Sequence, residues 1–106
     1  MITELTADSF ESQVLKAEGF VLVYLYAPWC SSCENTAPIV DELSDEYHRD
    51  EVSFYKIDTD KNPELAGSLG IRAIPAVLLF RGGTAPARML GRFTRAQLVN
   101  FLNQHT

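Results

Sequence analysis

The chain has 106 residues, the length of one domain with one hydrophobic core, and we expect a single domain over residues 1–106. Its composition, 46% hydrophobic and 22% charged, is that of a globular protein and excludes the disordered and fibrous classes. The formal net charge of -5, without any cluster of lysine and arginine, argues against nucleic acid as a partner, because binding to phosphates depends on basic side chains.

The sequence shows no targeting or membrane segment. Its first stretch, MITELTADSFESQV, lacks the basic region, apolar region and cleavage site of a signal peptide. The longest apolar runs, GFVLVYLYA and IPAVLLF, are too short to span a bilayer. We therefore expect a cytoplasmic protein with no membrane partner, although a processed chain would show the same pattern.

Strand and helix patterns alternate in the first part of the chain. Residues 2–5 predict a short edge strand, and Asp8 with Glu11 resembles a capping box that opens a helix to about Ala17. The apolar run FVLVYLYA, residues 20–27, is rich in β-branched and aromatic residues and predicts a central strand covered on both faces.

A helical pattern follows from Ser31 to about Tyr47, with apolar residues one, three and four positions apart. Pro38 within it removes a backbone hydrogen bond and should kink the helix. VSFYKID, residues 52–58, then predicts another strand.

The last part of the chain predicts a helix, a hairpin and a final helix. Asn62 followed by Pro63 starts a short helix that Gly70 ends. AVLLF and ARML flank RGGT, whose glycines permit a tight turn, and Thr94 with Gln97 forms a capping box for the last helix. The order β-α-β-α-β-α-β-β-α predicts an α/β fold with a central mixed sheet of four to five strands flanked by four helices.

Both cysteines of the chain, Cys30 and Cys33, lie where the central strand gives way to the long helix. At this spacing the two side chains share a helical face, close enough to form a disulfide. The free N–H groups and the dipole at the start of the helix favour a thiolate at Cys30 and lower its pKa. Cys33 lies deeper in the turn, which predicts that it is the resolving thiol in disulfide exchange.

Two other interpretations of the cysteine pair stay open at this point. The pair could be inert, or it could be half of a zinc or iron-sulfur site shared between two chains. His48 and His105 have no recognised ligand spacing, so one chain alone does not complete a zinc site. A single C-x-x-C in a βαβ context favours redox chemistry.

Nearly the whole chain resembles the thioredoxin family. The segment APWCSSC is similar to the active-site segment of thioredoxins and protein disulfide isomerases, and Ala37 with Pro38 matches the family's helix kink. KIDTDKNPELAGSLGIRAIPAVLLF matches the family from its third strand through the loop that ends in Ile-Pro, and Gly91 matches a glycine beside the active site. The resemblance implies the thioredoxin fold.

The resemblance also implies roles for single residues. Cys30 would be the nucleophile and Cys33 the resolving cysteine, and the bond between Ile74 and Pro75 would be cis and packed against the dithiol. Without the resemblance, an X-Pro bond would be expected to be trans. A proline there leaves neighbouring backbone groups free to pair with an extended substrate peptide. The expected surface for partner proteins comprises Trp29, Ala73, Ile74, Pro75 and Gly91, although ordinary packing could also explain the apolar members.

The turn between the cysteines departs from the family, since Ser31 and Ser32 replace its usual Gly-Pro or Gly-His. The serine hydroxyls can donate to a thiolate, and the absence of proline restores a backbone donor. Both changes would stabilise the reduced form, so we expect a potential less reducing than that of an ordinary thioredoxin.

A second departure concerns the buried acid of the family, which is replaced by Tyr24. A phenol with a pKa of about 10 is a poor base near neutral pH. We expect slow release of mixed disulfides unless water or Glu34 takes over, and Tyr24 to fill core volume. Lys56 matches the lysine beside the family's acid, and it would here lack a partner, turn to Asp58 or hydrogen-bond Tyr24.

These features predict an enzyme, a thiol-disulfide oxidoreductase that acts on protein disulfides and binds no cofactor. Its electrons would come from a thioredoxin reductase, which is a flavoprotein, or from another dithiol donor, and we expect a monomer. Two other functions remain open: a protein-binding module with the same surface, and a carrier of zinc or an iron-sulfur cluster built from two chains.

Overall fold

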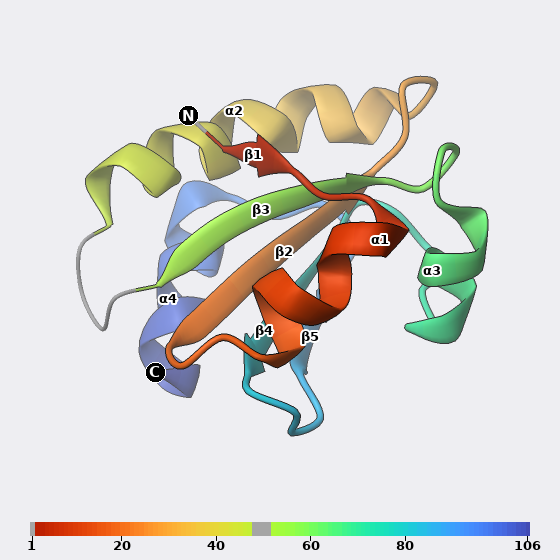
Figure 1. Ribbon diagram of the computed structural model, residues 1–106. Coiled ribbons are helices and arrows are strands. Elements are labelled where there is room, and N and C mark those ends of the chain that lie inside the picture. The colour runs from red at the N-terminus through yellow and green to blue at the C-terminus, as the bar shows by residue number, and fades with distance from the viewer. Residues whose placement is uncertain (1, 48–51) are drawn as a thin grey trace.

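The computed structural model describes residues 2–47 and 52–106, in which five strands form one mixed sheet (Figure 1). Its strands lie in the order β1-β3-β2-β4-β5. The first three are mutually parallel, whereas β4 runs antiparallel to β2 and β5 antiparallel to β4. The strands are β1 (Thr3–Glu4), β2 (Phe20–Tyr26), β3 (Ser53–Asp58), β4 (Ala76–Arg81) and β5 (Ala87–Leu90).

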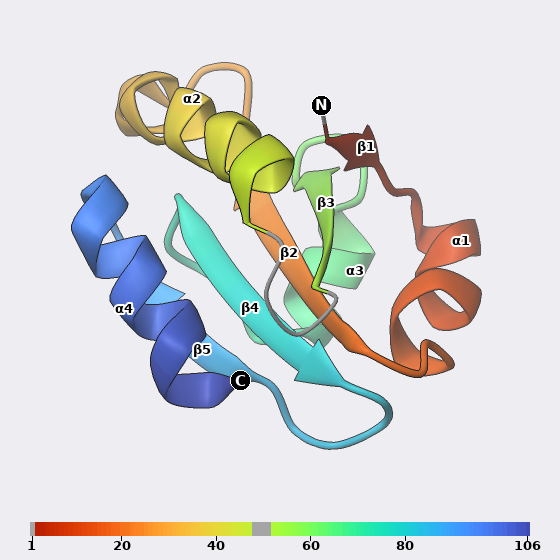
Figure 2. The same cartoon turned by 90° about the vertical axis from the view of Figure 1, so that its left-hand side faces the viewer.

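Four helices flank the sheet, which confirms the expected fold class. Helices α2 and α4 cover one face, and α1 and α3 lie on the other (Figure 2). The first helix, α1, continues directly into a π-helical turn, η1, that the sequence did not suggest. The helical segments are α1 (Ala7–Phe10), η1 (Glu11–Leu15), α2 (Ser31–Glu46), α3 (Pro63–Ser68) and α4 (Arg95–His105).

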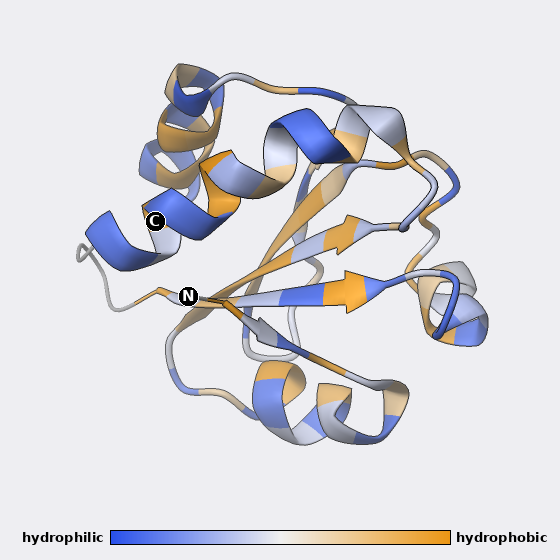
Figure 3. Cartoon of the chain, turned by 90° about the horizontal axis from the view of Figure 1, so that it is seen from above, coloured by the Kyte–Doolittle hydropathy of each residue, from blue (hydrophilic) through white to orange (hydrophobic). Residues whose placement is uncertain are grey.

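Strand β2 is central and covered on both sides, as its apolar sequence predicts. Because side chains alternate along a strand, its residues divide between two core clusters. One cluster lies under α1 and α3 and the other under α2 and α4. Apolar positions, in orange, occur along the strands and on the helices that flank them (Figure 3). The first cluster takes Val21, Val23 and Leu25, and the second takes Leu22 and Tyr24.

The predicted start of the first helix is wrong, because Thr6 rather than Asp8 is the N-cap. Thr6 has an extended backbone, and its N–H donates to the Ser9 hydroxyl at 3.1 Å. Asp8 is already inside the first turn. A serine completes the capping box here where the usual pattern has Glu or Gln, so the acidic pair drew the prediction two residues too far along the chain.

The predicted starts of α3 and α4 are confirmed. Asn62 is the N-cap of α3 with Pro63 as its first residue, and Thr94 and Gln97 form the capping box of α4. Helix α3 ends in a Schellman motif around Gly70, whose φ is 72°. In the hairpin turn only Gly82 takes a positive φ, of 61°. The kink at Pro38, which lies inside α2, stays a prediction.

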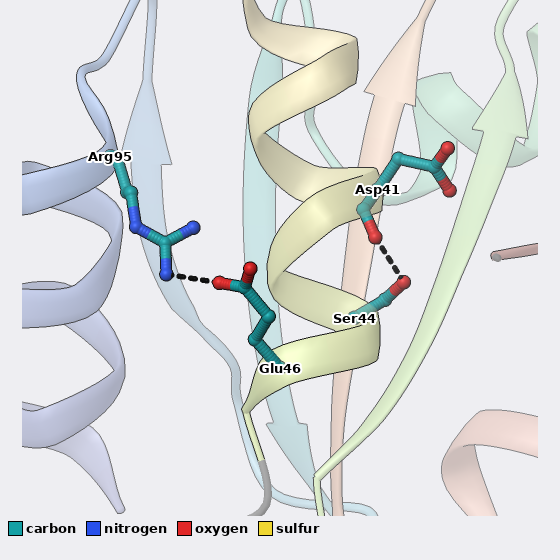
Figure 4. A network of polar contacts seen from close by, with 4 residues as sticks. All are labelled: Asp41, Ser44, Glu46 and Arg95. Atoms are coloured by element: carbon teal, nitrogen blue, oxygen red, sulfur yellow. Dashed lines mark hydrogen bonds and ion pairs between the residues drawn. The ribbon is translucent and has the colours of Figure 1, made fainter.

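The C-terminal end of α2 is tied to the start of α4. Arg95 forms an ion pair with Glu46, and within α2 the Ser44 hydroxyl donates to the Asp41 carbonyl at 2.6 Å (Figure 4). Both partners of the ion pair are exposed, so it contributes little to stability. These contacts lie at the opposite end of α2 from the cysteines. None of the helices in the described ranges has the length and apolar character needed to cross a membrane.

Candidate active site

The two cysteines form a disulfide at the N-terminus of α2. Cys30 is the N-cap and Cys33 is the third residue of the helix, and their Cα atoms are 5.3 Å apart. Cys30 therefore lies four residues beyond the end of β2, joined to it by a turn in which its N–H donates to the Ala27 carbonyl at 3.2 Å. Both cysteines are largely buried and pack with Ala27, Tyr26 and Ile74.

The sulfur of Cys30 receives a backbone hydrogen bond from the helix. The N–H of Cys33 lies 3.2 Å from Cys30 Sγ and is shared with the Cys30 carbonyl. As the N-cap, Cys30 also faces the positive end of the helix dipole. Once the disulfide is reduced, both effects favour a thiolate at this sulfur.

A loop of residues 73–75 and the residue after β5 border the dithiol. The bond between Ile74 and Pro75 is cis, as the resemblance implied. Ile74 is half-buried against the cysteines, Pro75 is buried and Ala73 is exposed. Gly91, with a φ of 86°, donates its N–H to the Pro75 carbonyl at 2.8 Å. The structure thus brings the distant segments of the predicted surface together at the dithiol.

Trp29 provides the largest exposed apolar surface next to the cysteines. Its side chain is 70% exposed, which is unusual for tryptophan. Its Nε1 donates to Asp60 Oδ1 at 3.0 Å, which fixes the ring while leaving it in solvent. Asp60 could not be singled out from the sequence, because this contact joins two loops that are 31 residues apart.

Tyr24 is buried directly beneath the first turn of α2. Its hydroxyl donates to the Cys33 carbonyl at 3.2 Å and lies 2.8 Å from the Thr36 hydroxyl. Thr36 is also buried, and its hydroxyl reaches the carbonyls of Ser32 and Cys33, each at 3.3 Å. Burial raises the pKa of Tyr24, and the hydrogen bond from Thr36 offsets this in part. The phenol therefore remains a neutral donor near pH 7.

Thr36 was not predicted as part of the site. It lies three residues after Cys33 on the same side of α2, so a polar residue on the inner face of the helix was the available signal.

Lys56 has a partner that none of the three sequence alternatives named. Its ammonium lies over the Tyr26 ring, 5.7 Å from the centroid, and the Tyr26 hydroxyl donates to Glu4. The buried Asp58 carboxylate instead accepts the N–H groups of Asp60 and, at 3.3 Å, Lys61. Asp58 thus shapes the turn before α3.

A pocket of about 420 Å³ opens between α2 and the sheet. It brings Glu34 to the same space as Tyr24 and Lys56, although Glu34 itself is exposed. Its remaining lining residues are Ile2, Ala37, Pro38, Val40 and Asp41.

The serines of the turn and the histidines complete the set of candidate residues. Ser31 is exposed and Ser32 half-buried, and among the described residues neither hydroxyl bonds to a sulfur of the disulfide. His105 lies in the last turn of α4, whereas His48 falls outside the described residues. Within residues 2–47 and 52–106, no group of three His, Cys, Asp or Glu side chains could hold a metal ion.

Comparisons with known proteins all match the same family. A family model described as Thioredoxin matches residues 1–104. The thioredoxin of Buchnera aphidicola subsp. Schizaphis graminum is 40% identical over 104 residues, which cover 98% of this chain and 95% of that protein. The thioredoxin of Allochromatium vinosum is also 40% identical over 104 residues, 98% of this chain and 96% of that protein. Thioredoxin 1 of Synechococcus elongatus is 38% identical over 100 residues, 94% of this chain and 92% of that protein.

Proposed function

Since this chain belongs to the thioredoxin family and is a thiol-disulfide oxidoreductase, we propose that it reduces disulfides of protein substrates through Cys30 and Cys33. One observation carries the proposal: the disulfide lies at a helix N-terminus, bordered by an exposed tryptophan and a loop with a cis proline. An inert structural disulfide would need no exposed apolar border of this kind.

The proposed reaction proceeds in two exchanges. The Cys30 thiolate attacks one sulfur of the substrate disulfide and forms a mixed disulfide with it, while the substrate S–S bond breaks and the other substrate sulfur leaves as a thiolate. The Cys33 thiolate then attacks Cys30 Sγ, which closes the internal disulfide and releases the second substrate thiolate. The substrate gains two electrons and the dithiol loses two. A thioredoxin reductase or another dithiol donor returns them.

The assignment of Cys30 as nucleophile rests on its surroundings. Its sulfur accepts the Cys33 N–H at 3.2 Å, and its chain neighbour is the exposed Trp29. Cys33 has its carbonyl bonded to the buried Tyr24 hydroxyl and lies on the inner side of the turn. This supports Cys33 as the resolving cysteine.

Protein substrates would dock on the surface formed by Trp29, Ala73, Ile74, Pro75 and Gly91. The loop of residues 73–75 lies beside the disulfide, so an extended peptide placed along it would bring its own disulfide to Cys30. An extended peptide would pair with the loop through backbone hydrogen bonds, so substrates of many sequences could bind.

We further propose that Tyr24 does not act as the base for Cys33, since burial raises its pKa and its hydroxyl donates to a carbonyl. Glu34, or water in the pocket that Glu34 and Tyr24 share, would accept the proton of Cys33. We also propose that Lys56 stabilises the sheet beside the site. Its ammonium lies over the Tyr26 ring, and it belongs to β3, which pairs with β2.

At the level of the whole protein we propose one domain over residues 1–106, a monomer and a cytoplasmic location. Nucleic acids and membranes are not among the proposed partners, in keeping with the net charge of -5. Both core clusters share the single sheet, which supports one cooperative unit.

The test is reduction of insulin combined with trapping of the mixed disulfide. The wild type should reduce insulin in the presence of dithiothreitol faster than dithiothreitol alone, and both Cys30→Ser and Cys33→Ser should abolish this. Cys33→Ser should accumulate a covalent complex with insulin, because the second exchange is blocked. Cys30→Ser serves as the matched control and should accumulate none.

Three results would contradict the proposal. Insulin reduction at the background rate would indicate a binding module. Metal or a coloured cluster in the purified protein, at one per two chains, would indicate a carrier. A covalent complex formed by Cys30→Ser instead of Cys33→Ser would exchange the two cysteine roles.

A further inference from the structure

We propose that Arg88, on β5, is a positioning residue for the substrate loop of residues 71–75. This inference rests on the proposed function, because it assumes that protein substrates dock on that loop. The Arg88 side chain bonds to the carbonyls of Leu69 and Gly70, directly before the loop, and acts through this backbone.

The side chain of Arg88 reaches from the sheet edge to the end of α3. Arg88 pairs with Leu78, whose side chain belongs to the core cluster under α1 and α3, so both residues point to that face. Its Nη2 donates to the Leu69 carbonyl and to the Gly70 carbonyl, each at 3.1 Å. One guanidinium nitrogen carries two hydrogens and can serve both acceptors.

Neither of these carbonyls is used by the Schellman motif, which engages the carbonyls of Ala66 and Gly67. The Ile71 N–H bonds to Ala66 and the Gly70 N–H to Gly67, both at 3.0 Å, so the chain reverses at Gly70. A cation at the C-terminal end of a helix is also favoured by the direction of the peptide dipoles. Arg88 therefore links the end of α3 to β5.

The other end of the loop is held by the same strand. Gly91, which directly follows β5, donates its N–H to the Pro75 carbonyl at 2.8 Å. Arg88 and Gly91 are three residues apart, and between them they fix both ends of the loop that carries Ala73 and Ile74. The position of β5 thereby sets the position of the loop relative to the dithiol.

Gly70 fits closely under the guanidinium. A Cβ added at Gly70 would lie 3.4 Å from Arg88 Nη2, and the φ of 72° favours glycine. The turn and the arginine are thus packed against each other.

Replacing Arg88 should weaken docking of protein substrates without impairing the dithiol. We expect Arg88→Met to raise KM for insulin about three- to tenfold with kcat nearly unchanged. This is less than the full loss of hydrogen bonds to a charged group, because Gly91 still holds the other end of the loop. Reduction of a small disulfide, 5,5′-dithiobis(2-nitrobenzoate), which needs no extended docking surface, should change less than about twofold. Arg88→Lys keeps the charge and should restore KM in part.

The matched control is Arg81→Met, at the far end of the same hairpin. Arg81 stacks on Phe20, 5.1 Å from the ring centroid, and is not near the loop ends. Arg81→Met removes the same charge and one surface contact. Because Arg81 is not near the loop ends, this substitution should leave KM for insulin unchanged. If Arg88→Met does not fold, Arg88→Lys is compared with the wild type instead, and its KM for insulin should be raised by a smaller factor.

An NMR readout separates this inference from the proposed function. In oxidised Arg88→Met, the amide resonances of Ala73, Ile74 and Gly91 should shift and the Gly91 amide should exchange faster, whereas Arg81→Met should leave them in place. Unchanged resonances, an unchanged KM for insulin, or an equal rise in Arg81→Met would overturn the role of Arg88. If the wild type does not reduce insulin at all, the proposed function fails, and the amide measurement still decides whether Arg88 positions the loop.

Discussion

At the scale of single residues, Tyr24 is the departure with the clearest chemical consequence. It is buried, it donates to the Cys33 carbonyl, and burial raises its pKa. The sequence predicted a poor base that fills the core, and the hydrogen bonds add a structural role. Tyr24 and Thr36 together hold the first turn of α2 against the sheet.

Replacing Tyr24 by aspartate should speed turnover. A buried carboxyl has a raised pKa and can accept the Cys33 proton near pH 7. Insulin reduction per folded molecule should rise about tenfold, less than the full effect of a general base, because Glu34 or water already serves the wild type in our proposal. The protein should lose about 3 kcal/mol of stability, because the ring leaves a cavity. The control Tyr24→Phe removes the hydroxyl without adding a base and should not be faster than the wild type. A Tyr24→Asp rate at or below that of the wild type would refute this role.

The raised pKa of Tyr24 also predicts how stability changes in alkali. Its folded-state pKa lies above the unfolded value of about 10, so its contribution is complete below that pH and is lost as the pH rises through the folded-state pKa. In urea unfolding at about pH 8 and pH 11, the free energy of unfolding should fall less in Tyr24→Phe than in the wild type. Equal falls in both proteins would show that Tyr24 titrates normally.

The contacts of Asp60 and Arg88 were not predicted from the sequence, and the physical reason is the same for both. Asp60 contacts Trp29 across 31 positions, and Arg88 contacts Leu69 across 19. Polar side chains on exposed loops and edge strands have many compatible partners, and only the folded backbone selects one. The spacing of Cys30 and Cys33 pointed to the dithiol directly, whereas Trp29 and Pro75 were singled out only by the family resemblance.

At the scale of elements, the start of α2 decides the chemistry. A helix N-terminus offers free N–H groups, and here one of them already lies on Cys30 Sγ. The turn of Ser31 and Ser32 occupies the first two helical positions, so both contribute backbone donors to this end.

The serine turn should make the protein less reducing than an ordinary thioredoxin. We expect a potential above about -270 mV when it is equilibrated against glutathione. Ser32→Pro removes one donor at the N-terminus of α2 and should lower the potential by about 30 to 60 mV, if that donor stabilises the thiolate as hydrogen bonds to charged groups do. Ser31→Ala, which keeps the backbone donor, is the control for the hydroxyl. A wild-type potential at or below the thioredoxin value would contradict this expectation.

Most elements were predictable because their signals are local, and the errors lie where signals overlap. The capping box of α4 was predicted to the residue, since Thr94 and Gln97 fit the pattern without a competitor. At α1 the prediction relied on Asp8 and Glu11, whereas the N-cap is Thr6. The π-helical turn after α1 has no distinct sequence pattern, because it differs from α-helix only in how the carbonyls are paired.

At the scale of the whole molecule, the fold brings together three segments that are distant in the sequence. The cysteines follow β2, the cis proline precedes β4, and Gly91 follows β5. Since β2, β4 and β5 are neighbours in the sheet, these ends meet at one edge. The order of the strands was not predicted from the sequence, because periodicity identifies strands without showing which of them pair.

The most direct test of the central claim is the pH dependence of iodoacetamide alkylation at Cys30 in the reduced protein. If the folded chain places this sulfur among free N–H groups at a helix N-terminus, its pKa should lie below about 8.5, the value of an ordinary thiol, and should return to that value in concentrated urea. A folded-state pKa at or above about 8.5 would contradict the claim.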